Sequence, residues 1–129
     1  MLEKHVRQLC EELELGASQS DERGEFQLEL APALSVRVKE LDPGMLLHSK
    51  LAACPTENKE ELFTLLMRAN FLGQGTKGAV IALEPGEKFL TLSLVIPYEM
   101  NFKAFKESVE DFVNILDYWR EELARFQKK

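Results

Sequence analysis

The sequence predicts an α+β fold in which three helices accompany a mostly antiparallel sheet of five strands. Two blocks of the chain alternate apolar and polar residues, which is typical of half-buried strands. Apolar residues at steps of three and four, typical of helices, precede, separate and follow these blocks. Because strands and helices are segregated, the expected order is α-β-β-β-α-β-β-α.

Length and composition favour a single domain over residues 1–129, with one hydrophobic core. No apolar run approaches the ~20 residues of a membrane span, and the N-terminus lacks the apolar centre of a signal peptide. We therefore expect a cytosolic protein without membrane insertion. The net charge of -6 opposes binding to nucleic acid. Cys10 and Cys54 belong to no CxxC motif and are expected to be reduced.

The first helix is predicted from Leu2, Val6, Leu9 and Leu13, which are spaced by four, three and four residues, and we expect it to end at Gly16. Its remaining positions are largely charged, so the helix is amphipathic.

Three strands are predicted to follow. Residues 25–30 and 34–39 alternate cleanly around a break at Ala31-Pro32, which predicts a hairpin. A turn at residues 42–44 then leads into a third strand over residues 45–53.

The helix expected after Asn58 has more apolar surface than one core-facing stripe requires. Asn58 and Glu61 fit a capping box at its start. One apolar row comprises Leu62, Leu65, Leu66, Ala69 and Leu72. A second row, displaced by one position, comprises Phe63, Met67 and Phe71. A surface helix normally has one stripe, so two rows predict burial on two sides, with another chain covering the second.

The last third of the chain predicts a hairpin and a long helix. Residues 79–83 and 89–96 are β-forming and flank a Pro-Gly turn. Asn101 is a plausible N-cap for the helix that follows. Its apolar stripe predicts a core element that covers one face of the sheet. The stripe comprises Phe102, Phe105, Val109, Phe112, Leu116, Trp119, Leu123 and Phe126.

No catalytic, metal or cofactor site is predicted. The segment Gly73 to Gly78 matches GxGxxG, but it leaves a helix and enters a strand, which is the reverse of a dinucleotide-binding loop. A permissive turn is the favoured interpretation. His5 and His48 belong to no metal-ligand or nucleophile motif. The alternative hypothesis is a small enzyme or ligand-binding domain with its site near Gly73–Gly78.

The function class that remains is binding of another protein or peptide on the molecular surface. An open antiparallel sheet leaves edge N–H and C=O groups, to which an extended peptide can add as a further strand.

The whole pattern resembles the class I type III secretion chaperones of Gram-negative bacteria, the group that includes the Tir chaperone. The resemblance rests on the acidic first helix, the middle segment LFTLLMRANFLGQGTKGAVIALEPGEKFLTLSLVIP and the final segment FKAFKESVEDFVNILDYWREEL. It implies a cytosolic, ATP-independent dimer that binds the N-terminal segment of a secreted effector. The effector would stay extended, soluble and competent for secretion.

The resemblance also implies two sets of site residues. The dimer interface is expected at Leu62, Phe63, Leu66, Met67, Asn70 and Val80. The effector-binding surface is expected at Val6, Leu9, Leu13, Phe26, Leu28, Leu34, Val36 and Leu47. Alternating positions cannot all face the cargo, so each residue of the second set can equally belong to the core. A homodimer is expected, and a heterodimer with a second chaperone chain is the alternative.

Overall fold

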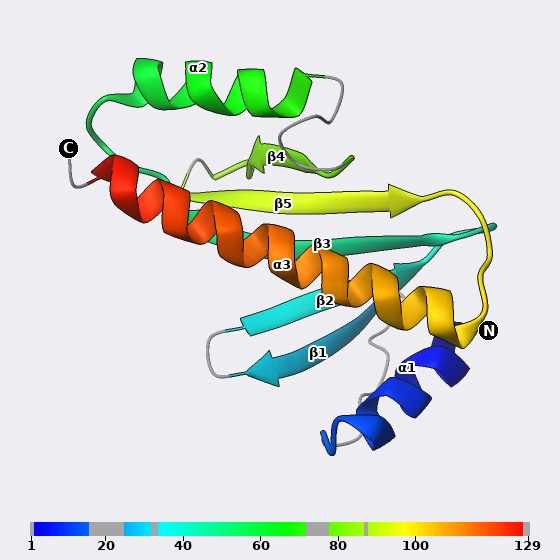
Figure 1. Ribbon diagram of the computed structural model, residues 1–129. Coiled ribbons are helices and arrows are strands. Elements are labelled where there is room, and N and C mark those ends of the chain that lie inside the picture. Colours follow the sequence, from blue (N-terminus) through cyan, green and yellow to red (C-terminus); the bar gives the residue numbers. More distant parts are fainter. Residues whose placement is uncertain (1, 16–24, 32–33, 72–77, 87, 128–129) are drawn as a thin grey trace. The chain divides into compact units, whose positions relative to one another are not determined.

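A computed structural model describes residues 2–15, 25–31, 34–71, 78–86 and 88–127 (Figure 1). The elements follow the predicted order: α1 (Leu2–Glu12), β1 (Glu25–Ala31), β2 (Leu34–Glu40), β3 (Met45–Ala53), α2 (Lys59–Asn70), β4 (Val80–Leu83), β5 (Phe89–Ile96) and α3 (Phe102–Gln127). The five strands form a sheet in the order β1-β2-β3-β5-β4. The predicted α+β fold is confirmed.

The chain divides into two compact units. Unit 1 comprises Met1–Ser49 and Val95–Glu110, and unit 2 comprises Lys50–Leu94 and Asp111–Lys129. Because β3, β5 and α3 each contain residues of both units, the two units are connected covalently through three regular elements.

Unit 1 is built on the antiparallel strands β1 and β2 and the beginning of β3. The β1–β2 register pairs Phe26 with Val38 and Leu28 with Val36, so the alternating apolar residues lie opposite one another and are buried. The turn before β3 depends on Gly44, whose φ is +107°. A Cβ atom at this position would lie 1.9 Å from the carbonyl oxygen of Ile96, so only glycine fits there.

Helix α1 packs on the first turns of α3 within unit 1. Val6 and Leu9 are buried, and the His5 ring stacks on Phe105 with centroids 5.5 Å apart. Near the end of α1, Lys106 of α3 donates to Glu12 over 2.9 Å. The amphipathic pattern of α1 therefore has the predicted cause, which is burial of a single face.

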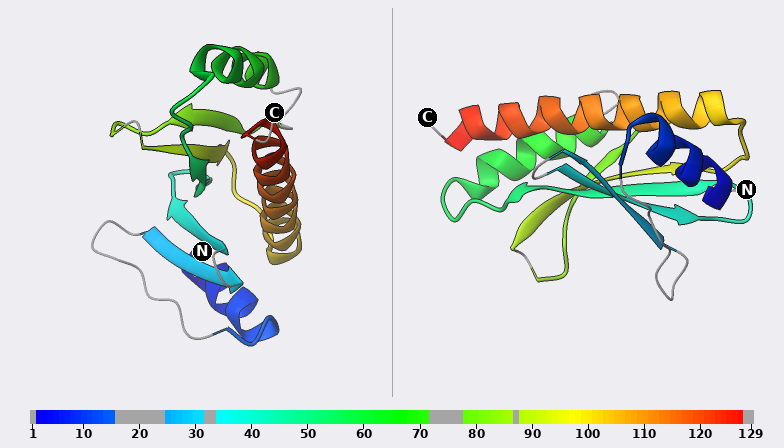
Figure 2. Two further views of the ribbon diagram at one scale, coloured as in Figure 1. Left: turned by 90° about the vertical axis from the view of Figure 1, so that its left-hand side faces the viewer. Right: turned by 90° about the horizontal axis from the view of Figure 1, so that it is seen from below.

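Unit 2 contains the end of β3, α2, β4, most of β5 and the larger part of α3. In Figures 1 and 2, α2 lies along the β4 side of the β4–β5 hairpin. Strands β4 and β5 are antiparallel, with Ile81 opposite Leu92. On α3, Arg120 donates through Nε to the carbonyl of Leu51 and through Nη2 to that of Lys50. The guanidinium group thus fixes α3 to the end of β3.

The apolar stripe of α3 is confirmed as core. Its six inner members are buried, while Phe102 and Phe126 at the ends are half-buried. The cap at Asn101 is confirmed too, because its Oδ1 accepts the backbone N–H of Ala104 at 2.9 Å.

The predicted capping box at Asn58 is wrong. Asn58 adopts the left-handed conformation (φ 57°, ψ 32°), and its side chain makes no capping hydrogen bond. An N-cap side chain reaches the helix N–H groups from an extended backbone, so this backbone does not present its amide to them. Helix α1 ends at Glu12, and the predicted stop at Gly16 lies outside the described residues. Strand β4 begins one residue later than predicted, at Val80.

Candidate binding surfaces

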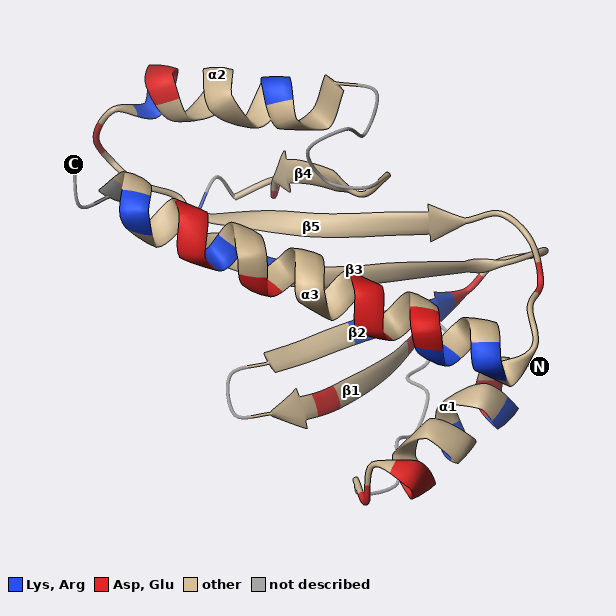
Figure 3. Cartoon of the chain, in the orientation of Figure 1, with Lys and Arg blue, Asp and Glu red and all other residues tan. Residues whose placement is uncertain are grey.

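Helix α2 buries three residues of its first apolar row and leaves much of the second row uncovered. Leu62, Leu66 and Ala69 are buried in unit 2. In the second row Phe63 is half-buried, whereas the exposed fraction is 74% for Met67 and 64% for Phe71. Figure 3 shows that charged residues lie toward the two ends of α2 and that the stretch between them is uncharged. The two rows inferred from the sequence therefore differ in environment.

The neighbouring strand β4 also has an exposed apolar side chain. Val80 on β4 is 52% exposed, and Leu65 on α2 is 38% exposed. Large apolar side chains that gather on adjacent elements are unusual on a monomer surface and mark a site for another molecule. We call Met67, Phe71 and Val80, with the half-buried Phe63, the α2 patch.

The predicted dimer residues therefore fall into three groups. Phe63, Met67 and Val80 belong to the α2 patch, while Leu62 and Leu66 are enclosed by their own chain. Asn70 is occupied internally: its Nδ2 donates to the carbonyl of Ile81 at 2.7 Å, and its Oδ1 accepts the Ile81 N–H at 2.9 Å. Phe71 is absent from the predicted interface although the periodicity placed it in the same row as Met67.

Most of the predicted effector-binding residues pack inside unit 1. Leu13 is 46% exposed and Leu34 is half-buried. The other six are buried: Val6, Leu9, Phe26, Leu28, Val36 and Leu47. These six side chains cannot contact a cargo peptide in this conformation. Of the predicted set, only Leu13 and Leu34 are accessible to cargo.

Strand β1 offers backbone groups rather than apolar area. It stands at one end of the strand order, so its outer edge faces no other described strand. Gln27 and Glu29 are exposed on β1, and their side chains bond each other at 2.7 Å. The β1–β2 register shifts between Glu29 and Ala31. Such an edge is the geometry to which an extended peptide can add.

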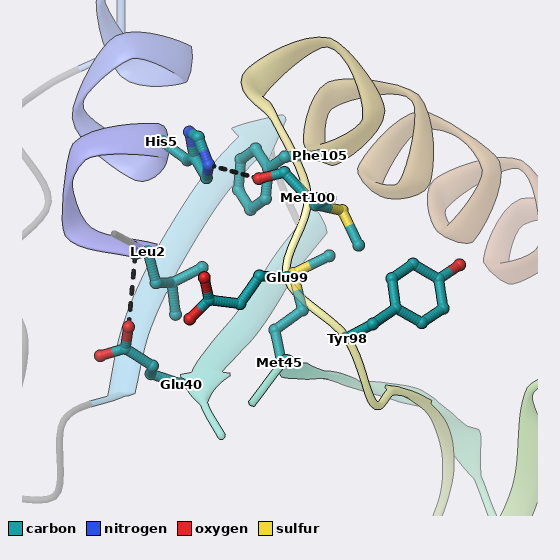
Figure 4. Close-up of a pocket in the computed structure, with 9 residues that line it drawn as sticks. Leu2, His5, Glu40, Met45, Tyr98, Glu99, Met100 and Phe105 are labelled. Carbon is teal, nitrogen blue, oxygen red and sulfur yellow. Dashed lines mark hydrogen bonds between the residues drawn. The ribbon is translucent and has the colours of Figure 1, made fainter. Parts of the chain in front are cut away.

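A small pocket lies in unit 1 between α1, the start of β3 and the segment before α3 (Figure 4). Its volume of about 30 Å³ holds roughly two water molecules. His5 donates through Nε2 to the Met100 carbonyl at 2.9 Å beside it. The walls are Leu2, His5, Glu40, Gly44, Met45, Tyr98, Glu99, Met100 and Phe105. This space is too small for a substrate of ordinary size.

Among the described residues, the one resolved pKa shift belongs to a salt bridge between two helices. The hydrogen bond and charge of Glu12 raise the pKa of Lys106 above its ordinary value. No three histidine, cysteine or acidic side chains among the described residues are grouped so that they could hold a metal ion. The alternative site at Gly73–Gly78 lies outside the described residues except for Gly78, which has a φ of +93°.

None of the described helices combines the length and hydropathy that crossing a bilayer requires.

Comparison with known proteins identifies the family. The model of the Tir chaperone protein (CesT) family matches residues 4–120. The chain is similar to a chain in the crystal structure of the ExsC-ExsE complex, with a TM-score of 0.78 and 14% sequence identity. The match covers 93% of this chain and 91% of that chain. It is also similar to the HopA1-SchA chaperone-effector complex, with a TM-score of 0.69, 13% identity and 93% coverage of both chains. No curated protein matches the chain significantly.

At such low identities the two structural likenesses show a shared fold, whereas the family match covers most of the sequence. The resemblance of the first helix, middle segment and last helix is thus confirmed. The chain belongs to the Tir chaperone protein (CesT) family and is a type III secretion chaperone.

Proposed function

We propose that the protein works in the bacterial cytosol as a dimer that binds the N-terminal segment of a secreted effector and keeps that segment extended. The activity is binding without catalysis, metal or cofactor. Effector binding follows from the family, and the HopA1-SchA relative is itself a chaperone-effector complex. The observation that carries the dimer is the uncovered α2 patch.

The α2 patch supports a dimer because the residues that the structure describes leave it uncovered. Burying an apolar side chain of this size contributes roughly 1.5 to 3 kcal/mol. Met67 and Phe71 are more than half exposed, so most of that gain is left for association. A second copy presents the same patch, which suits a two-fold interface. A different chaperone chain with a similar patch is the alternative partner, and mass measurement distinguishes the two.

We place the effector on unit 1, at the outer edge of β1 and the exposed Leu13 of α1. An added strand gains backbone hydrogen bonds along β1, while Leu13 supplies apolar contact. Glu29 is exposed on this strand, so a cargo strand with a lysine or arginine opposite it is favoured. The six buried residues of the predicted set support this surface from beneath.

We propose that residues 1–129 act as one chaperone domain. Three regular elements continue from unit 1 into unit 2, so neither unit has a complete set of strands and helices by itself. This continuity favours cooperative folding. A single unfolding transition, with the same midpoint by far-ultraviolet and near-ultraviolet circular dichroism, is the expected result.

Capture of cargo tests the proposed function directly. The chaperone is expressed in its native host, purified with its bound partner, treated with protease and analysed by mass spectrometry. We expect one protected segment, tens of residues long, from the N-terminal region of a secreted protein. Leu13→Ser and Glu29→Lys should reduce its yield while dimer mass stays unchanged. A complex that contains only folded, protease-resistant globular domains contradicts the proposal.

A further inference from the structure

The short strand β4 forms the other end of the sheet, and its backbone polarity can be assigned. In an antiparallel pair, each residue directs its N–H and C=O either both toward the partner strand or both away. Ala82 directs its carbonyl toward β5, because the Thr91 hydroxyl on β5 donates to it at 3.3 Å. The neighbouring Ile81 therefore directs its N–H and C=O away from β5, toward the open side of the sheet.

Both outward groups of Ile81 are taken by one side chain. Asn70, the last residue of α2, accepts the Ile81 N–H at 2.9 Å and donates to the Ile81 carbonyl at 2.7 Å. A carboxamide carries one acceptor and one donor side by side, as a peptide group does. Asn70 thus occupies the place that a peptide of an added strand would take.

We propose that Asn70 is a positioning residue that closes the outer edge of β4 and fixes the end of α2 against that strand. The two hydrogen bonds hold the last turn of α2 beside Ile81, so Met67 and Phe71 keep a defined position relative to Val80. The α2 patch is therefore assembled from two elements that Asn70 joins. Closure also prevents another strand from pairing with β4 at Ile81.

The closed edge has a consequence for the cargo, and this consequence rests on the proposed function. The sheet has two ends, β1 and β4. With Ile81 occupied, an effector strand can extend the sheet only at β1. Asn70 therefore determines at which edge the cargo adds, although it touches no cargo itself.

Amide hydrogen exchange of the chaperone without effector tests the closure. Asn70→Ala removes both hydrogen bonds, and we expect exchange at the Ile81 N–H to become about tenfold faster, as for loss of one hydrogen bond. Asn70→Asp keeps an acceptor for the Ile81 N–H but sets a second carboxylate oxygen against the Ile81 carbonyl, so we expect exchange at the Ile81 N–H to lie between that of the wild type and that of Asn70→Ala. The Ala82 N–H, which faces β5, is the internal control and should not change in either variant. Unchanged exchange at Ile81 in Asn70→Ala overturns the proposal.

General destabilisation of unit 2 would give a different exchange pattern from a specific loss of protection at the Ile81 amide. If Asn70→Ala simply destabilised unit 2, the Ala82 and Leu92 amides would accelerate together with Ile81. Thr64→Ala on the same helix is the matched control, because it removes one side-chain hydrogen bond, to Glu60, away from β4. Acceleration confined to Ile81 supports a specific closure, and acceleration throughout β4 and β5 contradicts it.

Self-association gives a second, independent readout. An opened β4 edge should pair with β4 edges of other copies, so Asn70→Ala is expected to form assemblies larger than the wild-type protein in light scattering. Ala82 is exposed, and Ala82→Lys places a charge on this strand. The double variant should return to the wild-type mass, because charged edge strands resist pairing. Large assemblies that persist in the double variant contradict edge pairing.

The cargo consequence is tested last, with an effector segment obtained from the capture experiment. Bound wild-type chaperone should gain amide protection at β1 only, and Asn70→Ala should gain it at β4 as well. Protection at β4 in the wild-type complex overturns the assignment of the edge. If no effector is captured, the proposed function fails while the exchange result for Ile81 still stands.

Discussion

Two consecutive residues of α2 have opposite environments. Leu66 is 5% exposed and belongs to the core of unit 2, whereas Met67 is 74% exposed. One side of this helix therefore belongs to the fold of its own chain, and a neighbouring side is exposed and available for the proposed dimer. Substitutions at these two positions separate folding from assembly.

Met67→Asp should give a folded monomer. An aspartate at this exposed site costs the lone chain little, but at an interface it would be buried without a partner charge. Light scattering coupled to size exclusion should show half the wild-type mass, with an unchanged circular dichroism spectrum. Arg68→Asp introduces the same residue on the polar side of α2 and should keep the dimer. Dimeric Met67→Asp would move the interface away from α2.

Leu66→Asp should instead prevent folding of unit 2. Its carboxylate would replace an apolar side chain inside the core, a change that destabilises by several kcal/mol. Thermal unfolding followed by circular dichroism measures the effect. A stable Leu66→Asp monomer would show that Leu66 belongs to the interface, as the family resemblance implied.

At the scale of whole elements, α3 contributes the two largest of the fully buried side chains. Phe105 and Phe112 are fully buried, one in each unit. Arg120 adds hydrogen bonds to the end of β3. The stability of both units therefore depends on this helix.

Phe112→Ala should destabilise the protein by about 3 to 5 kcal/mol, the usual cost of deleting a buried aromatic ring. Tyr118→Ala on the same helix is the matched control, because Tyr118 is 55% exposed. We expect that control to cost about 1 kcal/mol or less. Urea unfolding of the two variants measures the difference, and equal losses would contradict the assignment of the α3 stripe as core.

The contact between α1 and α3 predicts a dependence on pH. Glu12 raises the pKa of Lys106, so the folded state holds this proton more tightly than the unfolded state. The contribution is complete below the ordinary lysine pKa and decreases as the pH rises through the higher folded value. The stability difference between wild type and Lys106→Met should follow that course. Because both side chains of the pair reach the solvent, salt should reduce the difference at every pH.

At the scale of the whole molecule, periodicity in the sequence was sufficient for the order of elements. Strand β5 and the stripe of α3 were predicted well because alternation and steps of three and four report directly on which face is buried. Strand β3 was predicted from the turn at residues 42–44. The same signal could not separate core from binding surface. Leu28 and Val36 would be apolar and would alternate with polar residues whether they packed in the core or contacted a cargo peptide.

Polar side chains were harder to predict because their partners lie elsewhere in the chain. Asn70 was assigned to an interface, yet its amide bonds Ile81, eleven residues away, across a segment without periodic pattern. Asn58 was assigned as a cap from residue preference alone, although capping also needs an extended backbone. Apolar burial follows from local spacing, but these hydrogen bonds follow from tertiary structure.

The α2 patch also ties the protein's solubility to its abundance. Association in the proposed dimer is governed by mass action, so a copy made at low concentration would spend more time with Met67 and Phe71 in water. A monomer with an exposed apolar patch can then bind the apolar surfaces of other molecules before it binds a second copy. The proposed dimer therefore favours synthesis of several copies close together in time, because each copy then finds a second one sooner.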